Sequence, residues 1–175
     1  MNERRRRTIL RRAREILEES RVTAPPVPVE RIAWKLTAHL RFSPLDNELS
    51  GMVFVKDGTA IIGINALHHP NRQRFTIAHE CGHLVLHRDQ VTREVHVDKA
   101  FPMLMRDAVS AASVDPMEIE ANLFAAELLM PAFLLSEYLG DSTFDIDDDA
   151  TVTALARRFR VSLSAMQFRL GNLFA

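Results

Sequence analysis

The sequence has almost no cysteine and no long apolar run. Cys81 is the single cysteine among 175 residues, so no internal disulfide can form, which is typical of proteins in reducing compartments. The most apolar stretches, such as Leu123–Met130, fall far short of the ~20 residues that a membrane-spanning helix needs. The arginines at positions 4–7 are not followed by the apolar segment of a secretory signal. We therefore expect a cytoplasmic protein that does not span a membrane.

Basic side chains are missing from one long segment. Residues 107–156 carry eleven acidic side chains and no Lys or Arg, whereas residues 157–175 carry four Arg and no acid. Residues 1–21 carry eight Arg and four acids, and the whole chain has a net charge of -1. A nucleic-acid-binding domain is usually basic overall, so only the two ends of this chain could serve that purpose. Solvated helix faces explain the same arginines without any ligand.

The composition is that of a globular chain, with 47% hydrophobic and 26% charged residues, and the length is about that of one domain. Apolar spacing predicts helices near residues 9–17, 29–38, 71–87, 116–130, 150–159 and 162–173. Extended runs at residues 39–42, 51–55 and 60–64 predict strands, and Asp57-Gly58 predicts a hairpin between the last two. Residues 139–149 are expected to form an acidic loop. An α+β fold is therefore expected.

The residues His79-Glu80-Cys81-Gly82-His83 form an HExxH motif. Two histidines four residues apart lie on one helix face, so both rings can bind a single cation while Glu80 reaches a metal-bound water. Apolar residues precede and follow the motif, which places its helix in the core. Buried imidazoles and a buried carboxylate need partners, and a metal ion supplies one. Cys81 points away from the histidine face and is expected to pack in the core.

A catalytic zinc usually takes three protein ligands, and the third must come from outside the motif. His87 lies ~6 Å further along the helix axis, and Asp89 would need a glycine turn that the chain lacks, so neither is expected to bind. The later helix carries Glu118, Glu120 and Glu127. Glu118 fits the capping box at the start of this helix, and Glu127 lies near its C-terminal end. Glu120 lies among apolar residues, so its side of the helix should face inward. Glu120 is therefore the predicted third ligand.

These residues suggest a hydrolase that uses a metal-activated water. Glu80 would take the proton of the water and pass it to the leaving amine. Asn122 could orient a ligand histidine. His96, His69 and Tyr138 are the candidates for stabilising the oxyanion, and the sequence does not choose among them. The protease prediction depends on a divalent ion bound by His79, His83 and Glu120.

Two blocks of sequence resemble a known family. Residues 74–84, RFTIAHECGHL, and residues 118–131, EIEANLFAAELLMP, strongly resemble the ImmA/IrrE family of metallo-endopeptidases. The similarity extends over roughly residues 29–170 and leaves the Arg-rich first helix outside. The paired blocks are far more specific than the HExxH motif alone.

The resemblance implies a zincin-like metalloprotease domain with a small antiparallel or mixed sheet beside the HExxH helix. It also implies Zn²⁺ as the cofactor and a protein substrate, since several family members cleave helix-turn-helix repressors and so regulate transcription. By the same comparison His79, His83 and Glu120 match the metal ligands, and Glu80 matches the catalytic residue. The Gly51–Ile64 hairpin is expected to offer an edge strand to an extended substrate.

The C-terminal residues suggest a second, smaller subdomain. We expect a metallopeptidase domain at residues 1–135, including the Arg-rich helix, and a helical subdomain at residues 136–175. Residues 155–168 resemble a helix-turn-helix, so DNA contact is conceivable, although two helices that close the domain or hold a repressor explain the pattern as well. Two alternatives to a protease stay open: a zinc-containing binding module that leaves its partner uncut, and a DNA-binding regulator.

Overall fold

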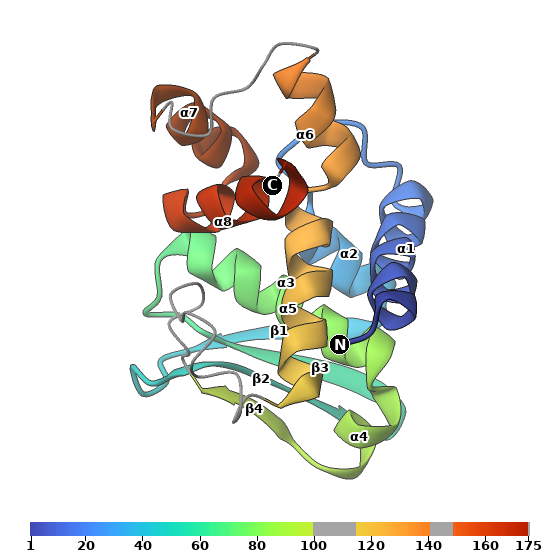
Figure 1. The fold of residues 1–175 in the computed structure, drawn as a ribbon. Helices are drawn as coiled ribbons and strands as arrows, with labels where there is room; N and C mark the ends of the chain where they lie inside the picture. The colour runs from blue at the N-terminus through green and yellow to red at the C-terminus, as the bar shows by residue number, and fades with distance from the viewer. Residues whose placement is uncertain (100–114, 141–148, 175) are drawn as a thin grey trace.

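The structure is a computed structural model that describes residues 1–99, 115–140 and 149–174. Most of the predicted acidic loop at residues 139–149 lies outside these ranges. The helices are α1 (Glu3–Glu19), α2 (Val29–Lys35), α3 (Pro70–Leu86), α4 (Arg88–Arg93), α5 (Pro116–Leu129), α6 (Ala132–Leu139), α7 (Asp149–Phe159) and α8 (Leu163–Phe174). The strands are β1 (Ala38–Ser43), β2 (Leu49–Lys56), β3 (Thr59–Asn65) and β4 (His96–Lys99). The predicted α+β class is confirmed (Figure 1).

The strands form one mixed sheet in the order β1-β3-β2-β4. β1 runs parallel to β3, and β2 runs antiparallel to both β3 and β4. The predicted hairpin is present, and both residues of its two-residue turn, Asp57 and Gly58, have positive φ angles, as a tight hairpin turn requires. Among the described residues, β3 has a neighbour on both sides, whereas β4 pairs with β2 only along residues 49–53, so the expected edge of the hairpin is limited to residues 54–56. In the part of the chain that the structure describes, the outermost strands are β1 and β4.

Helix α3 lies between the sheet and α5, with the remaining helices around and above them (Figure 1). All residues from Arg74 to Leu84 are buried, which is why the sequence of α3 is apolar on nearly all sides. Pro70 at its first turn and His69 as the capping residue begin the helix. The middle of α3, which carries the HExxH motif, is thus fixed on every side.

Gly82 lets α3 and α5 approach closely. A Cβ at this position would stand 3.1 Å from the Cα of Ala121 and 3.2 Å from its carbonyl oxygen. Backbone atoms cannot move aside as a flexible side chain can, so a larger residue would push the two helices apart. The close approach brings side chains of α5 within reach of the motif.

A buried carboxylate on α5 joins both ends of the chain. Glu127 is 1% exposed and pairs with Arg14 of α1 and with Arg169 of α8, which also donates to the carbonyl oxygen of Met130. Paired charges are what allow a carboxylate to be buried. These contacts cross the predicted boundary between residues 135 and 136, and the division into two parts stays a prediction.

Three elements were not expected from the sequence: α4, β4 and α6. Each is short, and β4 has four residues, too few for a recognisable alternation of apolar and polar side chains. Conversely, α2 ends at Lys35, earlier than predicted, because Thr37 adopts a positive φ of 61° that stops the helix before β1.

No single helix in the described ranges is long and apolar enough to cross a bilayer. Taken together, α5 and α6 have the length and composition of a candidate membrane-spanning segment, but the two helices are bent by 43° where they meet. Most of α5 faces other parts of the protein, as a core helix does.

Candidate metal centre

Helix α3 presents the HExxH motif in the core. His79 and His83 project from one face of the helix, and their Nε2 atoms lie 3.0 Å apart. Both rings and the carboxylate of Glu80 are buried. Cys81 is fully buried in the apolar core, as expected, and burial raises the pKa of its thiol. The helical, buried setting predicted for the motif is confirmed.

Two side chains from other elements reach the histidine pair. Glu118, in the first turn of α5, places one carboxylate oxygen 3.3 Å from His79 Nε2 and the other 3.3 Å from His83 Nε2. His96, from the edge strand β4, places Nε2 2.8 Å from Glu118 Oε1. One donor atom from each of these four residues lies within 4.8 Å of the others. We call these four residues the His/Glu cluster.

The His/Glu cluster has the dimensions of a metal site. Ligand atoms about 2.0–2.2 Å from a tetrahedral zinc ion lie roughly 3.3–3.5 Å from one another, and the measured separations run from 2.8 to 3.3 Å. His96 Nε2 and Glu118 Oε1 are buried and lie 2.8 Å apart. The Nε2 atoms of the buried His79 and His83 both lie against the carboxylate of Glu118, and polar groups in such a setting need a partner, which a cation can supply. Imidazole nitrogen and carboxylate oxygen suit a first-row divalent metal.

The structure does not bring Glu120 to the histidine pair, so the predicted third ligand requires a correction. The carboxylate of Glu120 accepts from Arg5 Nε at 2.8 Å and lies 2.9 Å from His87 Nε2, on the side of α5 that faces α1. Two residues along a helix correspond to a rotation of ~200°, which puts Glu118 on the side that faces α3. The capping role assigned to Glu118 belongs to Asp115 alone, which accepts from the backbone N–H two residues on. Glu118 is the carboxylate that could complete a metal site.

The surroundings keep these ligands ready to bind a cation. Burial disfavours the imidazolium and lowers the pKa of His83 to about 4. Burial alone would raise the pKa of Glu118, but the rings of His79, His83 and His96 outweigh it and hold that pKa well below its usual range. At neutral pH an unprotonated ring and an ionised carboxylate are therefore available, and metal binding need not displace a proton from either.

Strand β2 makes room for the HExxH helix with a glycine. A Cβ at Gly51 would stand 2.4 Å from Thr76 Cγ2 and 3.2 Å from Glu80 Oε1. The carboxylate of Glu80 therefore lies directly against the backbone of β2, and any larger residue at position 51 would displace it or the helix that carries it.

Gly51→Ala should destabilise the protein by about 1–3 kcal/mol, because the added methyl group overpacks the contact between β2 and α3. Gly171→Ala is the matched control: Gly171 lies in α8 with open space around the added atom, and alanine favours a helix. Thermal and urea unfolding measure both variants. Equal midpoints for the two would show that the space at Gly51 does not matter.

Two of the residues expected to assist the metal site lie beside it: Asn122, expected to orient a ligand histidine, and His96, a candidate for stabilising the oxyanion. Asn122 Oδ1 lies 3.0 Å from His79 Nδ1, so the predicted orienting contact is present. His69 caps α3, and the hydroxyl of Tyr138 accepts from an arginine of α7. Of the three candidates for stabilising an oxyanion, His96 is the one in the His/Glu cluster.

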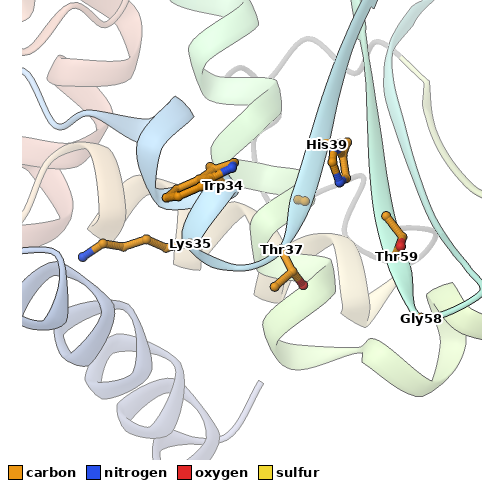
Figure 2. Close-up of a pocket in the computed structure, with 7 residues that line it drawn as sticks. Trp34, Lys35, Thr37, His39, Gly58 and Thr59 are labelled. Carbon is orange, nitrogen blue, oxygen red and sulfur yellow. The ribbon is translucent and has the colours of Figure 1, made fainter.

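A surface pocket of about 590 Å³ lies elsewhere, where α2 leads into β1 beside the β2–β3 turn (Figure 2). It is lined by Trp34, Lys35, Thr37, Ala38, His39, Gly58 and Thr59. Its lining includes no member of the His/Glu cluster and no carboxylate. The chemistry of the motif therefore does not take place in this pocket.

Comparison with known proteins supports the resemblance seen in the sequence. The chain is similar to uncharacterized immunity region protein 2 of Bacillus phage phi105, with 31% identity over 111 residues, which are 63% of each chain. It is also similar to the radiation response metalloprotease IrrE of Deinococcus radiodurans, with 33% identity over 112 residues, which are 63% of this chain and 30% of that protein. The matched region thus spans less than two thirds of either relative.

A family model supports the same resemblance over a longer part of the chain. The M78 peptidase model, described as the IrrE N-terminal-like domain, matches residues 33–171 and so includes the HExxH motif, β4 and α5. The match begins within α2 and leaves α1 outside. The chain therefore belongs to the IrrE N-terminal-like family of M78 peptidases.

Proposed function

We propose that the protein is a zinc-dependent endopeptidase with a zincin-like catalytic domain, in which His79, His83 and Glu118 bind the metal and Glu80 is the general base. One observation carries the proposal: the donor atoms of the His/Glu cluster lie within 4.8 Å of one another on and around the HExxH helix. Membership of a peptidase family and a relative named as a metalloprotease support it.

Zinc bound at this site would acidify a water molecule and polarise the scissile carbonyl group. Glu80 accepts a proton from the attacking water as the new C–O bond forms. It then gives that proton to the amide nitrogen as the C–N bond breaks, so that a carboxylate and an amine leave the site. The burial of Glu80 keeps its carboxylate away from bulk water, so bulk water does not compete with the attacking water for it.

His96 is the residue that we propose as the oxyanion donor. Its ring lies against that of His83, with centroids 3.9 Å apart, and its Nε2 points into the His/Glu cluster. An N–H at this point can donate to the carbonyl oxygen as negative charge develops on it. Because His96 comes from β4, the same strand can both hold a substrate and stabilise the reaction.

The proposed substrate is an extended segment of a helix-turn-helix repressor. Among the described strands β4 is the outermost one beside β2, and it carries His96, so a peptide that pairs along its outer edge would pass beside the His/Glu cluster. One relative is named as an immunity region protein and the other as a radiation response metalloprotease, which supports a regulatory role for the cleavage. The cytoplasmic location expected from the sequence is consistent with such a substrate.

We propose that α7 and α8 serve to close the domain and hold the substrate rather than to bind DNA. Two of the four arginines in this part have partners inside the protein: Arg169 pairs with Glu127, and Arg158 lies 4.2 Å from the ring centre of Tyr138 and donates to its hydroxyl. The buried Arg169 is therefore not available for phosphate contacts, whereas Arg158 holds its contact with Tyr138 at the surface. The proposal rests on these two internal contacts, which tie α7 and α8 to α5 and α6.

Co-expression with a helix-turn-helix repressor encoded beside the gene tests the proposed activity. We expect intact-mass spectrometry to find two repressor fragments whose masses sum to that of the intact protein plus one water. With purified proteins, a chelator should stop the cleavage and added Zn²⁺ should restore it. A stable complex with an uncut repressor would instead favour a binding module.

A further inference from the structure

We infer that Arg5, Glu120 and His87 form a relay that sets the orientation and tautomer of the metal ligand His83, so that α1 takes part in metal binding. We call these three residues the Arg-Glu-His relay. The inference rests on the proposed metal site. It assigns a role to Glu120, which lies outside the His/Glu cluster, and to a helix that lies before the residues matched by the family model.

The relay is a continuous chain of short contacts. His83 Nδ1, on the side of the ring away from the cluster, lies 3.2 Å from His87 Nδ1. His87 Nε2 lies 2.9 Å from Glu120 Oε2. Arg5 donates to both oxygens of Glu120, from Nε at 2.8 Å and from Nη2 at 2.5 Å. His87 is 5% exposed, so water does not compete strongly for its ring.

The direction of each hydrogen bond follows from the carboxylate. An ionised Glu120 can only accept, so His87 Nε2 must carry a hydrogen. A neutral imidazole has one N–H, so His87 Nδ1 is an acceptor and His83 Nδ1 must donate to it. The lone pair of His83 is then on Nε2, the atom that faces His79 and Glu118 in the cluster. The relay therefore selects the tautomer that metal binding requires.

Arg5 is what keeps Glu120 in its role as acceptor. The two N–H donors of the guanidinium face both oxygens of Glu120, and a carboxylate held in this way can only accept from His87. The bidentate contact also fixes the plane of the carboxylate, and with it the ring of His87. Without Arg5, Glu120 could rotate toward solvent at the surface between α1 and α5.

The other ligand histidine is oriented in a similar way by a residue of α5. The Nδ1 of His79 lies 3.0 Å from the side-chain oxygen of Asn122, which leaves Nε2 for the cluster. Both ligand histidines thus direct Nε2 to the cluster and Nδ1 to a fixed partner. For His79 the partner is a single amide, whereas for His83 it is a chain of three residues that ends on another helix.

Zinc affinity, measured by competition with a chelator of known affinity, tests the relay on the full-length protein. We expect Arg5→Met to weaken zinc binding on the order of 10-fold, in the range found for residues that orient metal ligands. The matched control is Arg14→Met, which removes the other arginine of α1 that pairs with a glutamate of α5, at 2.9 Å from Glu127. We expect this control to bind zinc like the wild type even if both variants unfold at a lower temperature.

A second pair of variants separates positioning from general stability. If Arg5 acts through His87, Arg5→Met should have no further effect on zinc affinity in a His87→Phe background, because the relay is already broken there. If His87→Phe does not fold, Glu120→Gln takes its place. ¹⁵N-histidine NMR of the zinc-bound protein should show His83 protonated at Nδ1 and should show that signal broadened or shifted in Arg5→Met.

The outcomes separate this inference from the proposed function. Equal zinc affinities for Arg5→Met and Arg14→Met, or additive effects in the His87 background, would overturn the relay while leaving the metalloprotease intact. A wild-type protein that binds no zinc would overturn both. A selective, non-additive loss on Arg5→Met supports the relay.

Discussion

Replacing Glu80 with glutamine should leave the zinc content of the purified protein unchanged and slow peptide cleavage by about 10²–10⁴-fold, the range for loss of a general base. Glutamine has nearly the same shape as glutamate but cannot accept a proton from water at neutral pH. The variant keeps the space at Gly51 and the ligands His79 and His83, so its fold and its metal should persist. Metal analysis and a cleavage time course on the same preparation measure both effects.

Glu94→Gln is the appropriate control for this variant. Glu94 is exposed at the end of α4, two residues before His96, so the same chemical change is made near the site but outside it. It should cleave at the wild-type rate. If Glu80→Gln also cleaves at the wild-type rate, another residue must accept the proton, and the assignment of Glu80 as the base is incorrect.

The second large effect should separate two glutamates on the same helix. We expect Glu118→Gln to lose stoichiometric zinc on dialysis, with affinity lowered by at least about 100-fold, since a charged ligand is removed from a buried site. Glu120→Gln should retain one zinc ion per chain, because its contribution through His87 and His83 is indirect and on the order of 10-fold. Metal analysis after dialysis gives a direct comparison.

If Glu120→Gln lost zinc and Glu118→Gln retained it, Glu120 would be the metal ligand, which would contradict the positions of the two side chains on α5. His96→Ala extends the same measurement to the fourth member of the cluster. As an oxyanion donor, His96 can be removed with zinc retained and cleavage slowed. Loss of zinc on this substitution would show that His96 is itself a ligand.

The HExxH helix could be predicted because its signals are local. Proline at the start, apolar residues on all sides and two histidines four positions apart are all visible within residues 70–86, and the structure places them as a buried helix against the sheet. The hairpin was predictable for the same reason, since Asp57-Gly58 specifies its turn. In each case neighbours in the sequence are also neighbours in the structure.

The rest of the site depends on contacts between distant segments, which the sequence does not specify. Choosing between Glu118 and Glu120 needs the rotation of α5 about its axis, and that rotation is set by the contact of Ala121 with Gly82. His96 was identified as one of three candidates, but its place in the cluster follows from the pairing of a four-residue strand with β2. The capping-box pattern suggested a purely structural role for Glu118 and so hid its place in the cluster.

The shared carboxylate of Glu127 has a practical consequence for work with shortened proteins. Because Arg14 and Arg169 approach it from opposite ends of the chain, removing either terminus leaves an anion inside the protein with half of its neutralising charge. A domain trimmed to the residues that the family model matches would keep Arg169 but lose Arg14. Loss of activity after such trimming would then report a misplaced α5 or the loss of Arg5 from the Arg-Glu-His relay rather than a missing catalytic group.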